Sequence, residues 1–235
     1  MPRRPRVSIP GYAEHIIQRG NNRQPIFACD EDIKAYAHWL GEYAKKFEVS
    51  IHAWVFMTNH VHLLCTPSST AAISKMMQSL GRQYVRYFNY TYQRTGTLWE
   101  GRFKSCLVQD QSYLFHLYRY IELNPVRADM VKDPADFSWS SYQCNGLGIN
   151  SELLTPHQLY QSLGRTKEER CDVYRAMFQY QVDDKLLEDI RLTANKGLVL
   201  GNDRFKEQIE LLTGQRQTQA KRGRKEGWRK NSDYG

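Results

Sequence analysis

The stretch SIHAWVFMTNHVHLLCTP, residues 50–67, decides the fold predicted for this chain. Residues 50–57 are apolar on both faces of an extended segment, which is typical of a buried strand. Thr58-Asn59 then fits a tight turn, and residues 60–66 return as the partner strand before Pro67 ends it. The stretch therefore predicts a buried antiparallel hairpin.

Further strands and helices are predicted on both sides of this hairpin. Strand patterns occupy residues 12–19 and 102–108, and apolar residues at helical spacing occupy 30–47, 71–92 and 110–123. The order strand-helix-strand-strand-helix-strand-helix matches a ferredoxin-like βαββαβ sandwich, an α+β fold whose antiparallel sheet carries two helices on one face. The third helix is extra and must pack elsewhere on that sheet.

After Asn150 the sequence signals are almost all helical. They predict four helices: one from Thr155-Pro156 to Gly164, one from the capping box Thr166–Glu169 to about Gln179, one at 184–195 before Gly197, and one at 203–213 before Gly214. We therefore divide the chain into a first domain with a basic arm (residues 1–148), a helical C-terminal domain (149–214) and a basic tail (215–235).

The net charge of +8 lies at the two ends of the chain. Residues 1–6 carry three arginines and no acid, and residues 216–235 carry seven basic residues against two acidic ones. The 209 residues between them hold 23 of each sign and are neutral. Basic ends favour a polyanionic partner such as nucleic acid, although basic tails also commonly serve only as solubilising segments.

Several classes of protein are excluded by the same sequence. No apolar run approaches the roughly 18 residues that a membrane helix needs, and the basic N-terminus is not followed by the apolar core of a secretory signal. The five cysteines are scattered and form no C-x-x-C pair. This pattern argues against a disulfide framework and fits a reducing cytosol, so we expect a cytoplasmic protein without a membrane partner.

Two motifs are candidates for chemistry. His60 and His62 project from one face of their strand and could chelate one divalent metal, although an isolated H-x-H pair is usually incidental. Their apolar flanks make two unsatisfied imidazoles costly. Tyr120 and Asn124 lie four residues apart on one helix face. The alternative is that Tyr120 is a core tyrosine and Asn124 ends the helix.

These motifs together resemble a known family. Residues 59–64 (NHVHLL) and 120–128 (YIELNPVRA) are similar to the two motifs of the single-tyrosine HUH transposase domain, where two histidines flank a hydrophobic residue. More specifically, the chain resembles the REP-associated tyrosine transposases within the IS200-like group, with support from residues 18–27 and 96–105. The resemblance spans roughly residues 7–145 and implies the same ferredoxin-like fold.

The resemblance implies a metal site and a nucleophile. His60 and His62 match the histidines that bind Mg²⁺ or Mn²⁺, Asn124 matches the third ligand, and Tyr120 matches the nucleophile. Related insertion-sequence transposases have glutamine at the third position, and two imidazoles with an amide also suit Zn²⁺. Tyr118 is the rival nucleophile, but it lies about 200° around the helix from Tyr120 and cannot share a stripe with Asn124.

The implied activity is a metal-dependent DNA transposase. Tyr120 would cleave and rejoin single-stranded DNA at palindromic REP hairpins through a 5′-phosphotyrosine, without a nucleotide cofactor, in a nucleoid-associated monomer or homodimer. The candidate DNA contacts are Arg3, Arg4, Arg6, Arg19, Arg23, Arg102, Lys104, Lys221, Arg222, Arg224 and Lys225. The alternatives are a non-cleaving regulatory protein that binds the repeats, and an RNA-binding module, for which the expected Gly/aromatic strand pattern is missing.

Overall fold

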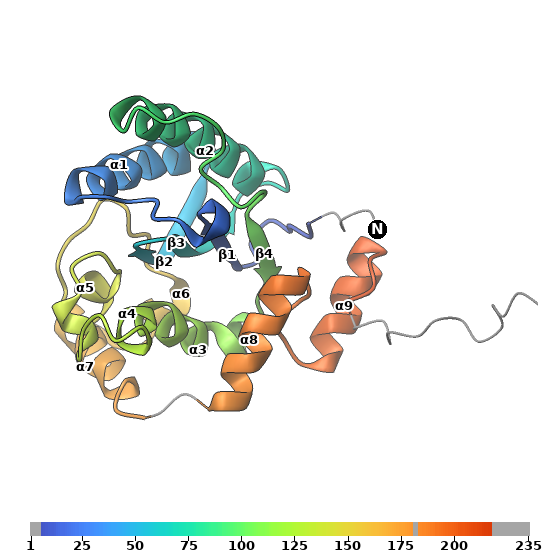
Figure 1. Cartoon of the computed structure of the whole chain (residues 1–235). Coiled ribbons are helices and arrows are strands. Elements are labelled where there is room, and N and C mark those ends of the chain that lie inside the picture. The colour runs from blue at the N-terminus through green and yellow to red at the C-terminus, as the bar shows by residue number, and fades with distance from the viewer. Residues whose placement is uncertain (1–5, 181–182, 218–235) are drawn as a thin grey trace, which may run out of the picture.

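The computed structural model describes residues 6–180 and 183–217. Its centre is a four-stranded antiparallel sheet in the order β2-β3-β1-β4 (Figure 1). The strands are β1 (Glu14–Arg19), β2 (Val49–Met57), β3 (His60–Pro67) and β4 (Lys104–Leu107). This strand order and the alternation with helices confirm the predicted α+β, ferredoxin-like sandwich.

Helices α1 (Asp30–Lys46) and α2 (Ala72–Thr91) cover one face of the sheet (Figure 1). Their predicted apolar stripes form one core with Val61, Leu63 and Cys65 of β3. These three strand residues alternate with His60, His62 and Leu64, so the two histidines face the opposite side of the sheet. The side-chain alternation of β3 thus separates a dry core from the histidine face.

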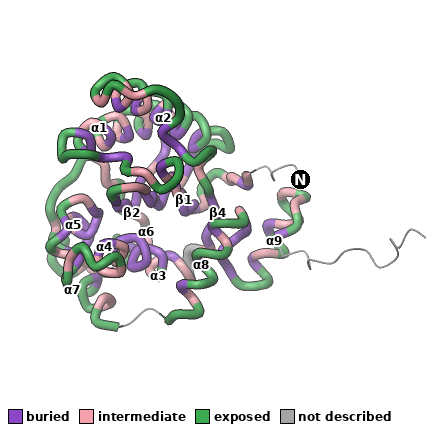
Figure 2. Tube along the Cα trace, in the orientation of Figure 1, coloured by how far each residue is buried: buried purple, intermediate pink, exposed green. Residues whose placement is uncertain are grey.

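Helix α3 (Asp110–Glu122) packs on that opposite face, and the short helix α4 (Asn124–Arg127) follows it. Leu114, Leu117 and Ile121 of α3 are fully buried in a second core that includes Ala53 and Val55 of β2. Strand β2 therefore faces an apolar layer on each side, as its continuous apolar sequence predicts, and Figure 2 shows buried residues along both layers.

The helices that follow α4 pack on two cores: most share the second core with α3, whereas the last one packs with Val7 and Leu107 in a third core. They are α5 (Tyr142–Asn145), α6 (Gln158–Gln161), α7 (Lys167–Met177), α8 (Asp184–Lys196) and α9 (Asp203–Thr213). Short 3₁₀ turns lie earlier in the chain, at Asn21–Arg23 and Pro134–Asp136. The predicted capping box of Thr166 and Glu169 begins α7. Gly197 and Gly214 end α8 and α9 in the left-handed conformation. The division of the chain into three parts stays a prediction.

The helix predicted from Thr155-Pro156 to Gly164 is wrong in length and in its cap. Helix α6 is a single turn, and its N-cap is His157, whose Nδ1 accepts from the Leu159 N–H. The backbone N–H of Thr155 instead donates to the carbonyl of Ile51 in β2. This hydrogen bond to the sheet holds Thr155 outside the helix, and local sequence signals do not reveal it.

A buried carboxyl group, Glu122 at the end of α3, joins α3 to the following helices. It accepts hydrogen bonds from Ser141 Oγ, Asn145 Nδ2 at 2.9 Å and Tyr174 Oη at 2.6 Å. Burial outweighs these bonds and raises the pKa of Glu122 to about 7. The network fixes the orientation of α3 against α5 and α7, and so helps to set the position of Tyr120.

Glu122 should make the stability of the fold depend on pH. Because its folded-state pKa is raised from 4.5 to about 7, the folded state binds the proton more tightly and loses stability as pH rises through that window. We expect the unfolding free energy of the wild type, relative to Glu122→Gln, to fall by on the order of 3 kcal/mol across it. Urea unfolding at several pH values measures this, with exposed Glu207→Gln as the control. Parallel profiles for wild type and Glu122→Gln would contradict the assignment.

No helix within residues 6–180 and 183–217 is long and apolar enough to cross a membrane.

Candidate active site

Side chains from β1, β3, α3 and α8 line one cavity of about 360 Å³ on the histidine face of the sheet. His60, His62, Tyr120 and Asn124 all contribute to its wall. The two histidines and the other two residues are about sixty residues apart in the sequence. Helix α3 packs across that face of the sheet, which brings Tyr120 and, at the start of α4, Asn124 over β3. The structure thus places all four predicted site residues at one cavity.

The two histidines are held through their Nδ1 atoms. His60 Nδ1 lies 2.7 Å from Asn59 Oδ1, an acceptor, so Nδ1 carries the proton and Nε2 has a free lone pair. His62 Nδ1 lies 2.8 Å from His15 Nε2. When the His62 Nδ1–H donates to His15, the Nε2 of His62 is likewise available to a metal. The ring centroids of His60 and His62 are 5.1 Å apart.

Both imidazoles are neutral at pH 7. Burial and the nearby Arg19 lower the pKa of His60 to about 4. Burial, together with the neighbouring His15, lowers the pKa of His62 below its ordinary value. A neutral imidazole is the form that binds metal ions, so the environment of the pair favours ligation over ion pairing.

Tyr120 is buried beside the histidine pair. Its ring meets His62 edge to face, with centroids 5.7 Å apart, and meets His15 in the same way at 5.8 Å. The guanidinium of Arg127 lies 4.7 Å from the centre of the Tyr120 ring and donates to the Tyr120 carbonyl. Burial lowers the pKa of Arg127 to about 10, which leaves it charged at pH 7. A positive charge therefore lies beside the phenol.

Asn124 occupies the junction between α3 and α4. Helix α3 ends at Glu122 with Leu123 as its C-cap, and α4 begins at Asn124 with Pro125 in its first turn. The Asn124 Nδ2 donates to the carbonyl of Tyr120 at 3.1 Å. This bond orients the amide so that its oxygen is the atom available to a metal.

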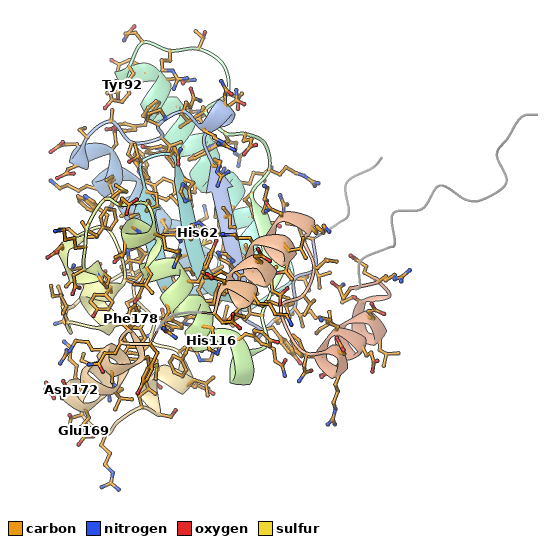
Figure 3. All side chains as sticks on the ribbon, turned by 60° about the horizontal axis from the view of Figure 1, so that its bottom comes forward. His62, Tyr92, His116, Glu169, Asp172 and Phe178 are labelled. Carbon is orange, nitrogen blue, oxygen red and sulfur yellow. The ribbon has the colours of Figure 1, made fainter. Side chains whose placement is uncertain are left out.

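Tyr118 does not reach the cavity. It is fully buried in the second core, where its ring meets Tyr174 edge to face at 5.9 Å between centroids. His116, one turn before Tyr120, is exposed. In Figure 3, His62 lies in the sheet near α8, whereas His116 lies on α3 away from the sheet. Of the tyrosines considered, the geometry favours Tyr120.

The cavity contains residues that the sequence motifs did not indicate. Arg191 and Asn195, one turn apart on α8, close one side, and Asn195 Oδ1 accepts from Lys104 Nζ at 2.8 Å. His15 of β1 is also buried and supports His62 from outside the cavity lining. A histidine within an apolar strand could have drawn attention to His15, but only the docking of α8 reveals the other two.

The predicted DNA contacts separate into three groups. Arg19, Arg102 and Lys104 line the cavity, where Arg191 makes a fourth cation against one acid, Glu100. Arg6 lies outside it against Phe103, and Arg23 is exposed in the turn at Asn21–Arg23 and does not line it. The others lie outside the described residues: Arg3, Arg4, Lys221, Arg222, Arg224 and Lys225.

The donor set fits a divalent metal ion. It offers two neutral imidazole nitrogens and one amide oxygen, and water or phosphate oxygens would complete the coordination. Among the described residues, no group of three or more His, Cys, Asp and Glu side chains could hold a metal. A metal at this cavity would therefore depend on the amide of Asn124 as well as on the two histidines.

A ferredoxin-like sheet that carries an H-x-H pair, with a tyrosine-bearing helix packed over it, defines a transposase domain of the single-tyrosine class. The chain belongs to the IS200-like transposase family: residues 8–124 match the family model described as "Transposase IS200 like". The matched span contains all four predicted site residues and ends at Asn124. No curated protein sequence matches the chain.

Solved structures also resemble the chain, and two of them are compared with it below. A REP-associated tyrosine transposase bound to a REP hairpin is 19% identical, with a TM-score of 0.51 over 67% of this chain and 93% of that chain. A second structure, from Deinococcus radiodurans R1, is 20% identical and covers 51% of this chain and 95% of its own, with a TM-score of 0.37. The first likeness supports the ferredoxin-like fold of this chain.

Proposed function

We propose that this transposase cleaves and rejoins single-stranded DNA at palindromic hairpins, with Tyr120 as the nucleophile. The observation that carries the proposal is the convergence of His60, His62, Tyr120 and Asn124 on one cavity lined by four cations. The solved relative that is bound to a REP hairpin supports hairpin DNA of that kind as the substrate. We expect monomers or homodimers.

The proposed reaction exchanges one phosphodiester for another. Arg19, Arg102 and Lys104 would hold the phosphates that flank the scissile bond. The Tyr120 oxygen bonds to phosphorus and the bond from phosphorus to the 3′-oxygen breaks. The phenol loses its proton to solvent and the departing 3′-oxygen takes one up, which leaves a 5′-phosphotyrosine and a free 3′-hydroxyl. An incoming 3′-hydroxyl reverses these steps, so no nucleotide cofactor is needed.

Metal binding at His60, His62 and Asn124 would supply the missing electrophilic assistance. A Mg²⁺ or Mn²⁺ ion held by these three residues would polarise the scissile phosphate and stabilise its developing negative charge. The chain itself contributes the neutral imidazoles, the oriented amide and the burial of the site. Because a phenol is a weak nucleophile at neutral pH, this assistance is the part of the chemistry that the side chains alone lack.

The experiment uses a hairpin with single-stranded flanks, labelled either at the 5′ end or at the 3′ end, with Mg²⁺ or Mn²⁺ and a denaturing protein gel. We expect the 3′ label to remain on the protein and the 5′ label to appear on a shortened strand. The alternative, a non-cleaving repeat-binding protein, predicts that both labelled strands bind and remain intact.

The basic tail provides a separate prediction. Deleting residues 218–235 removes six basic and two acidic residues. If the tail binds phosphates, the slope of log affinity against log salt should decrease by roughly one unit for each phosphate that the truncated chain no longer binds. Fluorescence anisotropy with a labelled hairpin across a salt series measures this. Superimposable salt plots for the full chain and the truncated chain would show that the tail does not bind DNA.

A further inference from the structure

A second concave surface, which we call the Gln18 groove, lies on the opposite face of the sheet from the catalytic cavity. It has a volume of about 650 Å³. Its apolar walls are Met77 and Val85 of α2 with Trp99 and Phe103, which precede β4, and Gln18 of β1 contributes to its floor. It lies beside the start of β4, one of the two edge strands of the sheet (Figure 1).

The Gln18 groove is strongly cationic. Five basic residues and no acidic residue are among the described residues that line it: Arg6, Lys75, Arg82, Arg86 and Arg102. The Arg6 guanidinium lies 3.7 Å from the centre of the Phe103 ring and donates twice to the Phe103 carbonyl. Burial and the neighbouring Arg102 lower the pKa of Arg6. Like charges held together in this way favour an anionic ligand.

The floor of the groove presents an unused hydrogen-bond acceptor. Gln18 is only 6% exposed, and its Oε1 has no hydrogen-bond partner among the described residues. A buried acceptor without a partner is destabilising, so a ligand that donates a hydrogen bond to it would recover the lost free energy. Gly81 of α2 leaves space beside it, because even an added Cβ would stay 3.9 Å from Gln18 Nε2.

The groove and the catalytic cavity share two lining residues. Gly101 and Arg102 line both, at the end of the sheet where the chain enters β4. A DNA strand that places its scissile phosphate near Tyr120 could therefore pass Arg102 around the sheet edge. Its backbone would then remain beside cations while a neighbouring base reaches the apolar walls. An apolar slot with a cationic rim and one polar group in its floor matches an unstacked base on its phosphate backbone.

We propose that the Gln18 groove binds one unstacked base of the single strand that flanks the cleavage site. Gln18 Oε1 accepts a hydrogen bond from the ring N–H or amino group of that base. Met77, Val85 and Trp99 contact its faces, and Arg82, Arg86 and Arg102 bind the adjoining phosphates. This inference rests on the proposed function only because the base is assigned to the single strand that flanks the proposed cleavage site. It adds a base-reading site to a catalytic cavity that holds phosphates.

The test compares how removal of single bases from the DNA affects the affinity of the wild type and of a Gln18 variant. Hairpins carrying one abasic site at each successive position of the single-stranded flank are bound, without metal, to the wild type and to Gln18→Leu. Leucine removes the unpaired acceptor at similar volume, so the variant should remain folded. We expect an abasic site at one position to weaken hairpin binding by the wild type by about tenfold. Gln18→Leu should bind the intact hairpin about tenfold less tightly, and the abasic site should then have no further effect on its affinity.

Gln83→Leu, on α2 but outside the groove lining, is the matched control and should bind as the wild type does. Gly81→Ala places a methyl group 3.5 Å from Trp99 Nε1 and should narrow the groove without disrupting the helix. It should therefore reduce the effect of the same abasic position on hairpin binding. If every abasic position weakens binding equally in the wild type and in Gln18→Leu, the inference is wrong even if the protein cleaves DNA. If Gln18→Leu instead changes the oligomeric mass and leaves DNA binding unaltered, the groove is an interface between copies. Coupling without cleavage would overturn only the proposed function.

Discussion

Tyr120→Phe should abolish the covalent protein–DNA adduct and reduce strand cleavage by at least about a thousandfold, because the phenolic oxygen is the proposed nucleophile. The substitution keeps the ring, so its contacts with His62 and Arg127 remain. Hairpin affinity should therefore change by no more than about twofold, since phosphate contacts elsewhere supply most of it. The gel assay with the 3′-labelled hairpin measures the adduct, and anisotropy measures the affinity.

Tyr118→Phe is the matched control for this experiment. The two tyrosines lie in the same helix, but Tyr118 is fully buried against Tyr174 and does not line the cavity. We expect Tyr118→Phe to form the adduct at the wild-type rate. An adduct that persists in Tyr120→Phe and disappears in Tyr118→Phe would reverse the assignment of the nucleophile.

The second large effect concerns the metal site. His60→Ala should weaken Mn²⁺ binding by at least about a hundredfold and abolish metal-dependent cleavage, because it removes one of only two imidazole ligands. His60 is the better choice of the pair since it is half-buried, whereas truncating His62 would also leave buried His15 without its partner. Isothermal titration calorimetry with Mn²⁺ measures metal binding by His60→Ala and by the wild type independently of DNA cleavage.

Chelation and a surface control complete this second prediction. EDTA should stop cleavage by the wild type, and added Mg²⁺ or Mn²⁺ should restore it. His116→Ala should bind Mn²⁺ and cleave DNA as the wild type does, because His116 is exposed and does not line the cavity. Unchanged Mn²⁺ affinity in His60→Ala would place the metal elsewhere.

Most of the fold could be predicted because its signals are local. The hairpin at 50–67, the apolar stripes of α1 and α2, and the glycines that end α8 and α9 each depend on neighbouring residues. The failure at α6 has the opposite origin. Thr155-Pro156 carries a helix-start pattern, but Thr155 pairs with Ile51 of β2 through a contact more than a hundred residues away in sequence.

The candidate site divides in the same way. The spacing of His60 with His62, and of Tyr120 with Asn124, is visible in the sequence because each pair is separated by only a few residues. The support that His15 gives to His62 requires the register of β1 on β3. The wall formed by Arg191 requires the docking of α8, which no local pattern encodes.

The most direct test of the central claim is mass spectrometry of the trapped adduct after digestion with nuclease and trypsin. Trypsin cleaves after Lys104, Arg119 and Arg127, so Tyr118 and Tyr120 fall in different peptides, 105–119 and 120–127. We predict a nucleotide joined through its 5′-phosphate to the peptide 120–127, at Tyr120. A nucleotide on the peptide 105–119, or intact DNA with both peptides unmodified, would contradict the account.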